Sequence, residues 1–70
     1  MKIVRETYDP IVEEYCYLLT HKNEIWLIQT YSKWSKKRFD KEWGTFANHT
    51  DISRIVFMSL TKHSTRHSSL

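Results

Sequence analysis

Apolar and aromatic residues gather in short runs that polar residues separate, and three of these runs predict strands. Residues 2–8, KIVRETY, predict a first strand. Asp9-Pro10 ends that strand, because proline lacks the N–H that a strand ladder needs. Residues 25–31, IWLIQTY, and 52–61, ISRIVFMSLT, are rich in β-branched and aromatic residues and predict two further strands.

The last predicted strand is apolar on both of its faces. Ile55 and Phe57 alternate with Val56, Met58 and Leu60. Because successive side chains of a strand point to opposite faces, this alternation places apolar groups on each side. A strand of this kind is normally covered on both sides, so we expect it near the centre of a sheet, with a helix packed on one side.

Residues 11–20, IVEEYCYLLT, are compatible with two structures. Asp9 as N-cap and Pro10 at the first helical position are typical of a helix start. Against this, the second half of the run is rich in strand formers, and a polar loop containing an asparagine follows it. The pattern favours a hairpin that pairs residues 13–20 with 24–31, and a helix is the alternative.

Residues 33–47 predict an amphipathic helix. At 100° per residue, Phe39, Trp43 and Phe46 fall within about 60° of one another and form the stripe that would face the core. Lysines spaced by four residues form a basic ridge on another face of the same helix. The ridge consists of Lys33, Lys37 and Lys41.

Together these elements predict a small α+β domain, in which an antiparallel sheet of three or four strands packs on one helix. An all-α bundle is the alternative. A chain of 70 residues is long enough for one domain with a small core, and we assign it to residues 1–62. Residues 63–70 are rich in serine and histidine and predict a flexible basic tail.

Charge and composition restrict the partners. The net charge is +3, but residues 1–31 carry −2 and residues 32–70 carry +5, which predicts a surface for nucleic acid or for an acidic protein face. A single glycine excludes the glycine-rich loops that bind nucleotides, and no cofactor is predicted. The chain has no apolar stretch of membrane-spanning length and a single cysteine, Cys16, so we expect a cytoplasmic protein that does not enter a membrane.

Trp34 has two interpretations. If Ser35 is the N-cap of the helix, Trp34 precedes the cap and Phe39 stands at the fourth helical position, which are the two positions of a hydrophobic staple. If the helix begins earlier, Trp34 lies on the basic face, where it is well placed to stack on a base. Both interpretations stay open at this point.

The first turn of the helix is unusual in its charge. With Ser35 as N-cap, Lys36, Lys37 and Arg38 occupy the first three helical positions, where each cation is unfavourable by roughly 0.3–1 kcal/mol. Phosphate is a natural ligand for exposed backbone N–H groups surrounded by cations. We therefore expect a small, non-enzymatic nucleic-acid-binding protein. The predicted contact residues are Lys33, Trp34, Lys36, Lys37, Arg38, Lys41 and Arg54.

A protein-interaction module is the alternative function. Ten aromatic residues are many for so small a core, and exposed tyrosine, tryptophan and arginine are enriched at binding hot spots. A small inhibitor or adaptor that docks on a larger complex would have this composition. An uncovered sheet edge would also allow a homodimer. The tyrosines proposed for the interaction face are Tyr8, Tyr15, Tyr17 and Tyr31.

A small metal-independent RNase is a third, weaker hypothesis. Such an enzyme needs an acid, a base and cations, and the available side chains are His49, Arg54, Lys37 and Arg38. We predict no catalytic residues, because His49 and its polar neighbours are more typical of a turn. His63 and His67 have the spacing of a helical metal site but lie in the polar tail, so no metal is predicted.

Overall fold

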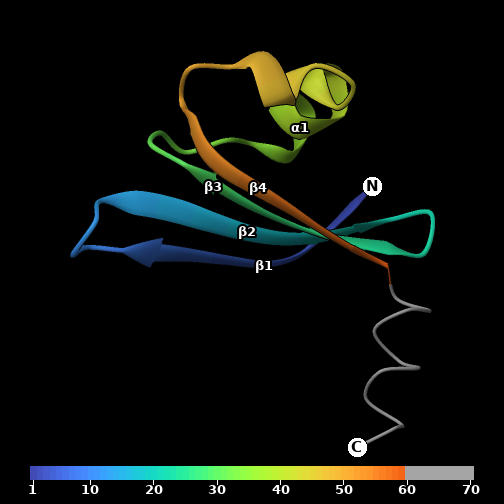
Figure 1. Ribbon diagram of the computed structural model, residues 1–70, viewed down its shortest axis with the longest axis horizontal. Coiled ribbons are helices and arrows are strands. Elements are labelled where there is room, and N and C mark those ends of the chain that lie inside the picture. The colour runs from blue at the N-terminus through green and yellow to red at the C-terminus, as the bar shows by residue number, and fades with distance from the viewer. Residues whose placement is uncertain (60–70) are drawn as a thin grey trace, which may run out of the picture.

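The computed structural model describes residues 1–59, and within them the fold is a four-stranded antiparallel sheet with one short helix (Figure 1). The strands follow one another in chain order across the sheet. They are β1 (Lys2–Asp9), β2 (Glu14–His21), β3 (Glu24–Thr30) and β4 (Ile52–Ser59). Between β3 and β4 lie α1 (Lys36–Glu42) and a 3-10 turn, η1 (Phe46–Asn48).

The predicted α+β class is confirmed, and the all-α alternative is wrong. Leu60 and the predicted tail, residues 63–70, lie outside the described residues. β1, β2 and β3 each pair with the next strand along the chain, and short hairpin turns connect β1 to β2 and β2 to β3. Short turns leave most residues for the strands, so a small chain can form the sheet.

The hairpin prediction for residues 11–20 is confirmed, and the helical alternative is wrong. Glu14–His21 is hydrogen-bonded on both sides, to β1 and to β3, so its backbone groups are paired without a helix. Asp9 caps a turn and not a helix, since its Oδ1 accepts a hydrogen bond from the backbone N–H of Ile11 at 2.9 Å. Glu13, with φ of 56°, then reverses the chain into β2.

A two-residue turn joins β2 to β3. Lys22 and Asn23 have φ values of 49° and 63°, so both occupy the left-handed region. Two successive left-handed residues match the right-handed twist of the flanking strands, and asparagine tolerates this conformation well. The His21↔Glu24 pair closes the turn and sets the register of the whole hairpin.

β4 corrects one prediction and confirms another. It pairs with β3 alone, so among the described strands it is an edge strand and not a central one. Its faces are as predicted: Ile55 lies opposite Ile28 and Phe57 opposite Trp26, on the side of the sheet that α1 covers. Val56 and Met58 point to the other side.

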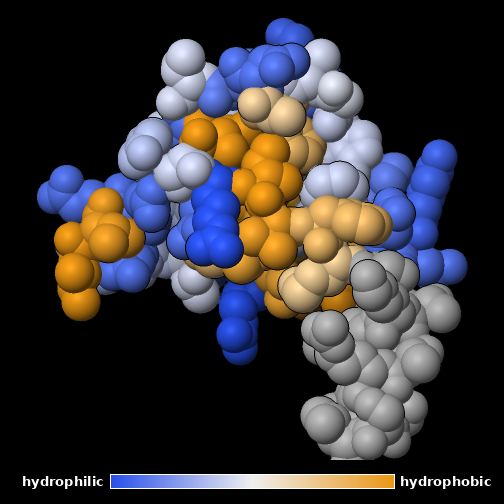
Figure 2. All heavy atoms as spheres, in the orientation of Figure 1, coloured by the Kyte–Doolittle hydropathy of each residue, from blue (hydrophilic) through white to orange (hydrophobic). Residues whose placement is uncertain are grey.

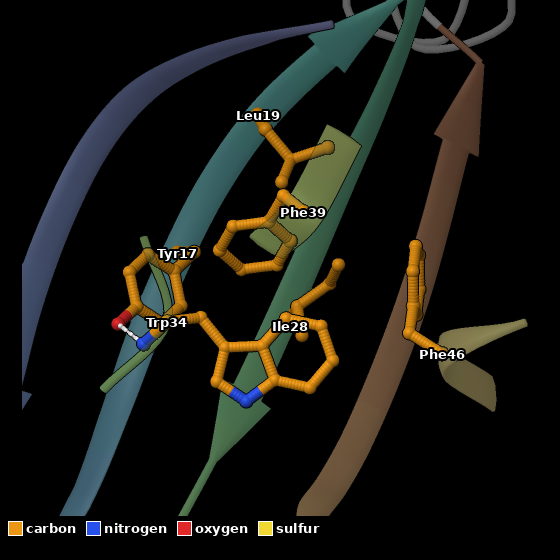
Figure 3. Close-up of a cluster of buried hydrophobic side chains, with 6 residues drawn as sticks. All are labelled: Tyr17, Leu19, Ile28, Trp34, Phe39 and Phe46. Carbon is orange, nitrogen blue, oxygen red and sulfur yellow. Dashed lines mark hydrogen bonds between the residues drawn. The ribbon is translucent and has the colours of Figure 1, made fainter. Parts of the chain in front are cut away.

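The core lies between α1 and one face of the sheet (Figure 3). β2 and β3 supply residues from the middle of the sheet, and the segment between β3 and β4 supplies three aromatic rings that cover them. The buried apolar residues are Tyr17, Leu19, Ile28, Trp34, Phe39 and Phe46. Aromatic rings dominate because a single short helix has few other side chains with which to cover the sheet.

The helix is shorter than predicted. It ends at Glu42, and the chain then passes through Gly44 into η1, so residues 33–47 are not one continuous helix. Two of the three predicted core residues are buried, Phe39 in α1 and Phe46 in η1, whereas Trp43 is half-buried. Because Lys33 precedes the helix, the predicted basic ridge contains only Lys37 and Lys41.

Candidate functional site

The start of α1 is built as the sequence predicts. The Ser35 hydroxyl accepts a hydrogen bond from the backbone N–H of Arg38 at 3.1 Å, and the Ser35 carbonyl accepts from Phe39 at 3.0 Å. Ser35 is therefore the N-cap, and no acidic residue lies in the first turn. Lys36, Lys37 and Arg38 occupy the positions at which the helix dipole disfavours positive charge.

Trp34 is a core residue. Its side chain is 1% exposed, and its ring centre lies 5.0 Å from that of Phe39, so the hydrophobic staple is confirmed. The alternative role, a ring that stacks on a base, is wrong because no face of the indole is open to solvent. Its backbone N–H donates to the Tyr17 hydroxyl at 2.7 Å, and this contact anchors the segment to β2 (Figure 3).

Asp51 joins the helix start to the segment before β4. Its Oδ2 accepts hydrogen bonds from the indole N–H of Trp34 at 2.9 Å and from the Ser32 hydroxyl at 2.8 Å. Arg38 donates to the same oxygen at 3.0 Å. Burial alone would raise the pKa of the Asp51 carboxyl, but these hydrogen bonds and the Arg38 charge outweigh it and hold the pKa below its usual range.

The contact between Arg38 and Asp51 gives Arg38 a structural role. Its guanidinium also lies over the Trp34 ring, 3.9 Å from the ring centre, in a cation–π contact. A guanidinium held in this way has fewer free N–H groups for a phosphate. Arg38 therefore contributes less to an anion-binding surface than the sequence predicts.

The remaining cations of the predicted site differ in their surroundings. Lys36 pairs with Asp40 at 2.7 Å, and Lys33 lies 3.8 Å from Glu6. Lys37 and Lys41 are exposed and make no salt bridge among residues 1–59. The described residues hold nine of the eleven Lys and Arg and all eight Asp and Glu, so their formal charge is only +1.

Arg54 does not join this group. It pairs with Gln29 in the register of β3 and β4, and its side chain points to the face of the sheet opposite α1. The side chains proposed for RNA cleavage are therefore not assembled, because Arg54 and Arg38 lie on different sides of the sheet. His49, the proposed acid or base, instead packs against the Trp34 ring and contacts Glu42.

The face of the sheet opposite α1 carries no described element on it. Six half-buried apolar side chains from β2, β3 and β4 lie on this face together with the polar Thr20 and Gln29, and we call this surface the open face. The six apolar side chains are Cys16, Leu18, Ile25, Leu27, Val56 and Met58. Figure 2 shows hydrophobic side chains gathered in a band over the strands on the side of the molecule that it presents.

The register arranges the open face in rows across the strands. Arg5, Leu18, Leu27 and Val56 form the central row, and Arg54 belongs to the row beside it. Basic side chains thus flank the apolar centre on both edge strands. The apolar alternation in β4 was the sequence signal for this surface. We did not predict the surface from it, because the pattern indicated that both faces of β4 would be covered.

The β1–β2 turn carries a second exposed apolar group. Ile11 is 91% exposed and Val12 is 53% exposed. The β1–β2 turn lies at the left end of Figure 1, and hydrophobic side chains lie at the same end in Figure 2. The turn is held by the Asp9 side chain and by the contact between the tilted rings of Tyr8 and Tyr15, whose centres lie 4.8 Å apart. An isoleucine held almost entirely in water by an ordered turn is available for contact with another molecule.

Two structural findings bear on other classes of site. Across residues 1–59, no three His, Cys, Asp or Glu side chains are placed to hold a metal ion together. None of the helices in this part of the chain has the length and apolar character needed to cross a membrane.

Comparisons with known proteins add no relatives. No protein-family model matches the sequence, and neither the curated proteins nor the solved structures contain a match.

Proposed function

We propose that this protein is a non-enzymatic protein-binding module whose binding surface is the open face of its sheet. The observation that carries this proposal is the row of apolar side chains from β2, β3 and β4 with no described element over them. Burying apolar area stabilises an association by about 25 cal/mol per Å², so a second chain placed here gains from each of these side chains. The single cysteine, Cys16, is free and suits a reducing compartment such as the cytoplasm.

The binding surface differs from the one that the sequence suggested for this function. Of the four proposed tyrosines, Tyr17 is fully buried and Tyr15 is half-buried, so they do not form one exposed aromatic face. Tyr8 and Tyr31 are exposed at 49% and 59%. The apolar side chains of the open face include no aromatic ring, and such a surface favours protein partners, since nucleic acids bind sheets mainly through aromatic stacking.

A photo-crosslinking experiment tests the proposal. A photoreactive amino acid replaces Leu27 at the centre of the open face, and in a matched control variant it replaces Ala47, which is exposed in η1 on the helical side. Both variants are irradiated in nuclease-treated cell extract. We expect discrete protein adducts from position 27 and none from position 47. Equal labelling at both positions, or no adduct at either, would contradict the proposal.

Nucleic-acid binding is the second candidate function, and it now rests on Lys37 and Lys41. They lie four residues apart on one face of α1, exposed and without a salt bridge among residues 1–59. Lys37→Glu combined with Lys41→Glu leaves the Arg38–Asp51 contact intact. The double variant therefore changes the surface charge without removing an ion pair that the fold uses. Fluorescence anisotropy with labelled DNA and RNA at two salt concentrations provides the measurement. Binding that falls steeply with salt and is lost in the variant would support this function.

A further inference from the structure

Along β1 and β2 the two ends of the open face carry opposite charges, whereas β4 carries Arg54 in the row next to the acidic end. Asp9 and Glu14 pair at the end of the sheet beside the β1–β2 turn, and both point to the same side as the open face. Lys2 and Arg5 lie toward the other end of β1 on this side. A surface with an acidic end and a basic end is complementary to a copy of itself that is turned end for end.

The exposed turn has an apolar counterpart at the basic end. Ile11 and Val12 extend beyond the acidic end of the hairpin. At the opposite end of the open face, Ile25 and Met58 lie side by side in the row that begins with Lys2. When the two ends are brought together with β1 over β1, the charges match, and the turn lies over Lys2 and Thr20 on the two strands beside Ile25 and Met58.

The edges of the sheet are less suited to pairing than its face. The register shifts between Ile3 and Arg5 in β1, which places an irregularity in one edge strand. A second shift, opposite Gln29 and Thr30, leaves Ser53 as the extra residue of β4, the other edge strand. Such bulges bend an edge and interrupt its row of free backbone groups, and native proteins use them to prevent pairing between edges.

The size of the open face also bears on the partner. Four strands about 4.8 Å apart and seven residues rising about 3.3 Å each cover roughly 400 Å² in projection. A standard protein interface buries about 800 Å² on each partner, so the face alone is small for a stable complex. A partner must also cover the exposed turn, and a second copy placed end for end does this twice.

We propose that the open face packs against the open face of a second copy, related to the first by a two-fold axis that runs across the strands between the two sheets. This inference rests on the proposed function and names the partner for the same surface. Each β1–β2 turn then lies over the basic end of the other copy, so that Asp9 and Glu14 face Lys2. An axis parallel to the strands would instead place β1 over β4 of the other copy. Asp9 would then lie nearest Arg54, but Lys2 would lie opposite Met58 without an acidic partner.

The assembly is a sandwich of two four-stranded sheets. Packed sheets lie about 10 Å apart with their strands within about 30° of alignment, a spacing that interlocking Leu18, Leu27 and Val56 side chains fill. Both copies of α1 lie on the outside, so Lys37 and Lys41 stay exposed in the dimer. Cys16 becomes covered, because it lies on the open face beside Leu18.

Sedimentation equilibrium of the purified full chain, from about 5 to 500 μM, tests the inference. We expect a mass that approaches twice the 8.5 kDa of one chain as concentration rises. Leu27→Glu places a charge at the centre of the interface and should raise the dimer dissociation constant by at least about 100-fold. Ala47→Glu, on the helical side, is the matched control and should leave it unchanged. Circular dichroism confirms that each variant is folded.

A charge exchange tests the orientation and keeps the inference testable if Leu27→Glu does not fold. Lys2→Glu and Glu14→Lys should each weaken the dimer by about tenfold, because each brings like charges together. The two changes combined keep the net charge at +3 and should restore the parent dissociation constant. Additive weakening in the combined variant would overturn the proposed axis.

Protection of the single thiol provides an independent measurement. Reaction of Cys16 with a thiol reagent should slow as the dimer forms and should not slow in Leu27→Glu. A mass that stays at 8.5 kDa at every concentration would overturn the inference. A dimer that tolerates Leu27→Glu and leaves Cys16 reactive would also overturn it, because a dimer paired through its sheet edges behaves in this way. A monomer that still gives position-27 adducts with other proteins in extract would refute the second copy and leave the proposed function standing.

Discussion

The guanidinium carbon of Arg38 lies 3.9 Å from the centre of the Trp34 ring. The sequence suggested that both residues would contact a ligand, yet each is a partner of the other, and Asp51 hydrogen-bonds to both. The cluster closes one end of the core, where the chain leaves β3 and where it enters β4. Substitutions in this cluster should therefore change the stability of the fold, whether or not they also change binding.

Asp51→Ala should lower the free energy of unfolding by about 2 kcal/mol, because three donors lose a common acceptor and the indole N–H of Trp34 is left buried. The control is Asp40→Ala, which removes only the exposed ion pair with Lys36 and should cost less than about 1 kcal/mol. Urea denaturation of both variants at pH 7 measures the difference. Equal losses in the two variants would contradict the role assigned to Asp51.

The pH dependence of stability should also report on Asp51. Its pKa is lowered in the folded protein, mainly because hydrogen bonds from Trp34 and Ser32 outweigh the effect of burial. A carboxyl with a lowered pKa stabilises the fold above its unfolded value of about 3.9, and this contribution is lost as the pH falls through the folded-state pKa. The stability difference between the parent and Asp51→Asn should therefore be constant from pH 7 to 5 and shrink below pH 4. A difference that stays constant to pH 2 would argue against this assignment.

Local sequence signals predicted most of the fold. β-branched and aromatic runs identified β3 and β4, and the Ser35 cap with Trp34 and Phe39 identified the start of α1. These features depend on neighbours within five residues along the chain, so the sequence contains the necessary information. The position of β4 at an edge depends on strand order, which alternation of side chains alone does not encode.

The candidate site was harder to predict for a related reason. A run of lysines and arginines identifies cations but not the acids that the fold brings to them. Asp51 reaches Arg38 from thirteen residues away, and Glu6, in β1, reaches Lys33 from 27 residues away. The open face was missed because a strand that is apolar on both sides looks the same in sequence whether a second layer covers it or not.

Lys37→Glu should stabilise the isolated fold. Lys37 occupies the second position of α1, makes no salt bridge among residues 1–59, and lies in a first turn without acidic residues. A negative charge there interacts favourably with the helix dipole, so we expect a gain of roughly 0.3–1 kcal/mol at low ionic strength. Thermal unfolding at low and at high salt measures the gain, and it should shrink with added salt. A loss of stability would mean that Lys37 makes a contact that the fold needs.

Tyr17→Phe should destabilise the protein by about 1–3 kcal/mol, because the backbone N–H of Trp34 loses its acceptor in a fully buried position. The phenyl ring fills the same space, so the cost comes from the unpaired N–H and not from a cavity. Burial also raises the pKa of the Tyr17 phenol, so the hydroxyl is neutral at pH 7. Tyr31→Phe removes a hydroxyl that is exposed and should change stability by less than about 0.5 kcal/mol. Urea denaturation compares the two, and a Tyr17 variant as stable as the Tyr31 variant would show that the hydrogen bond between β2 and the helix start does not anchor α1 to the sheet.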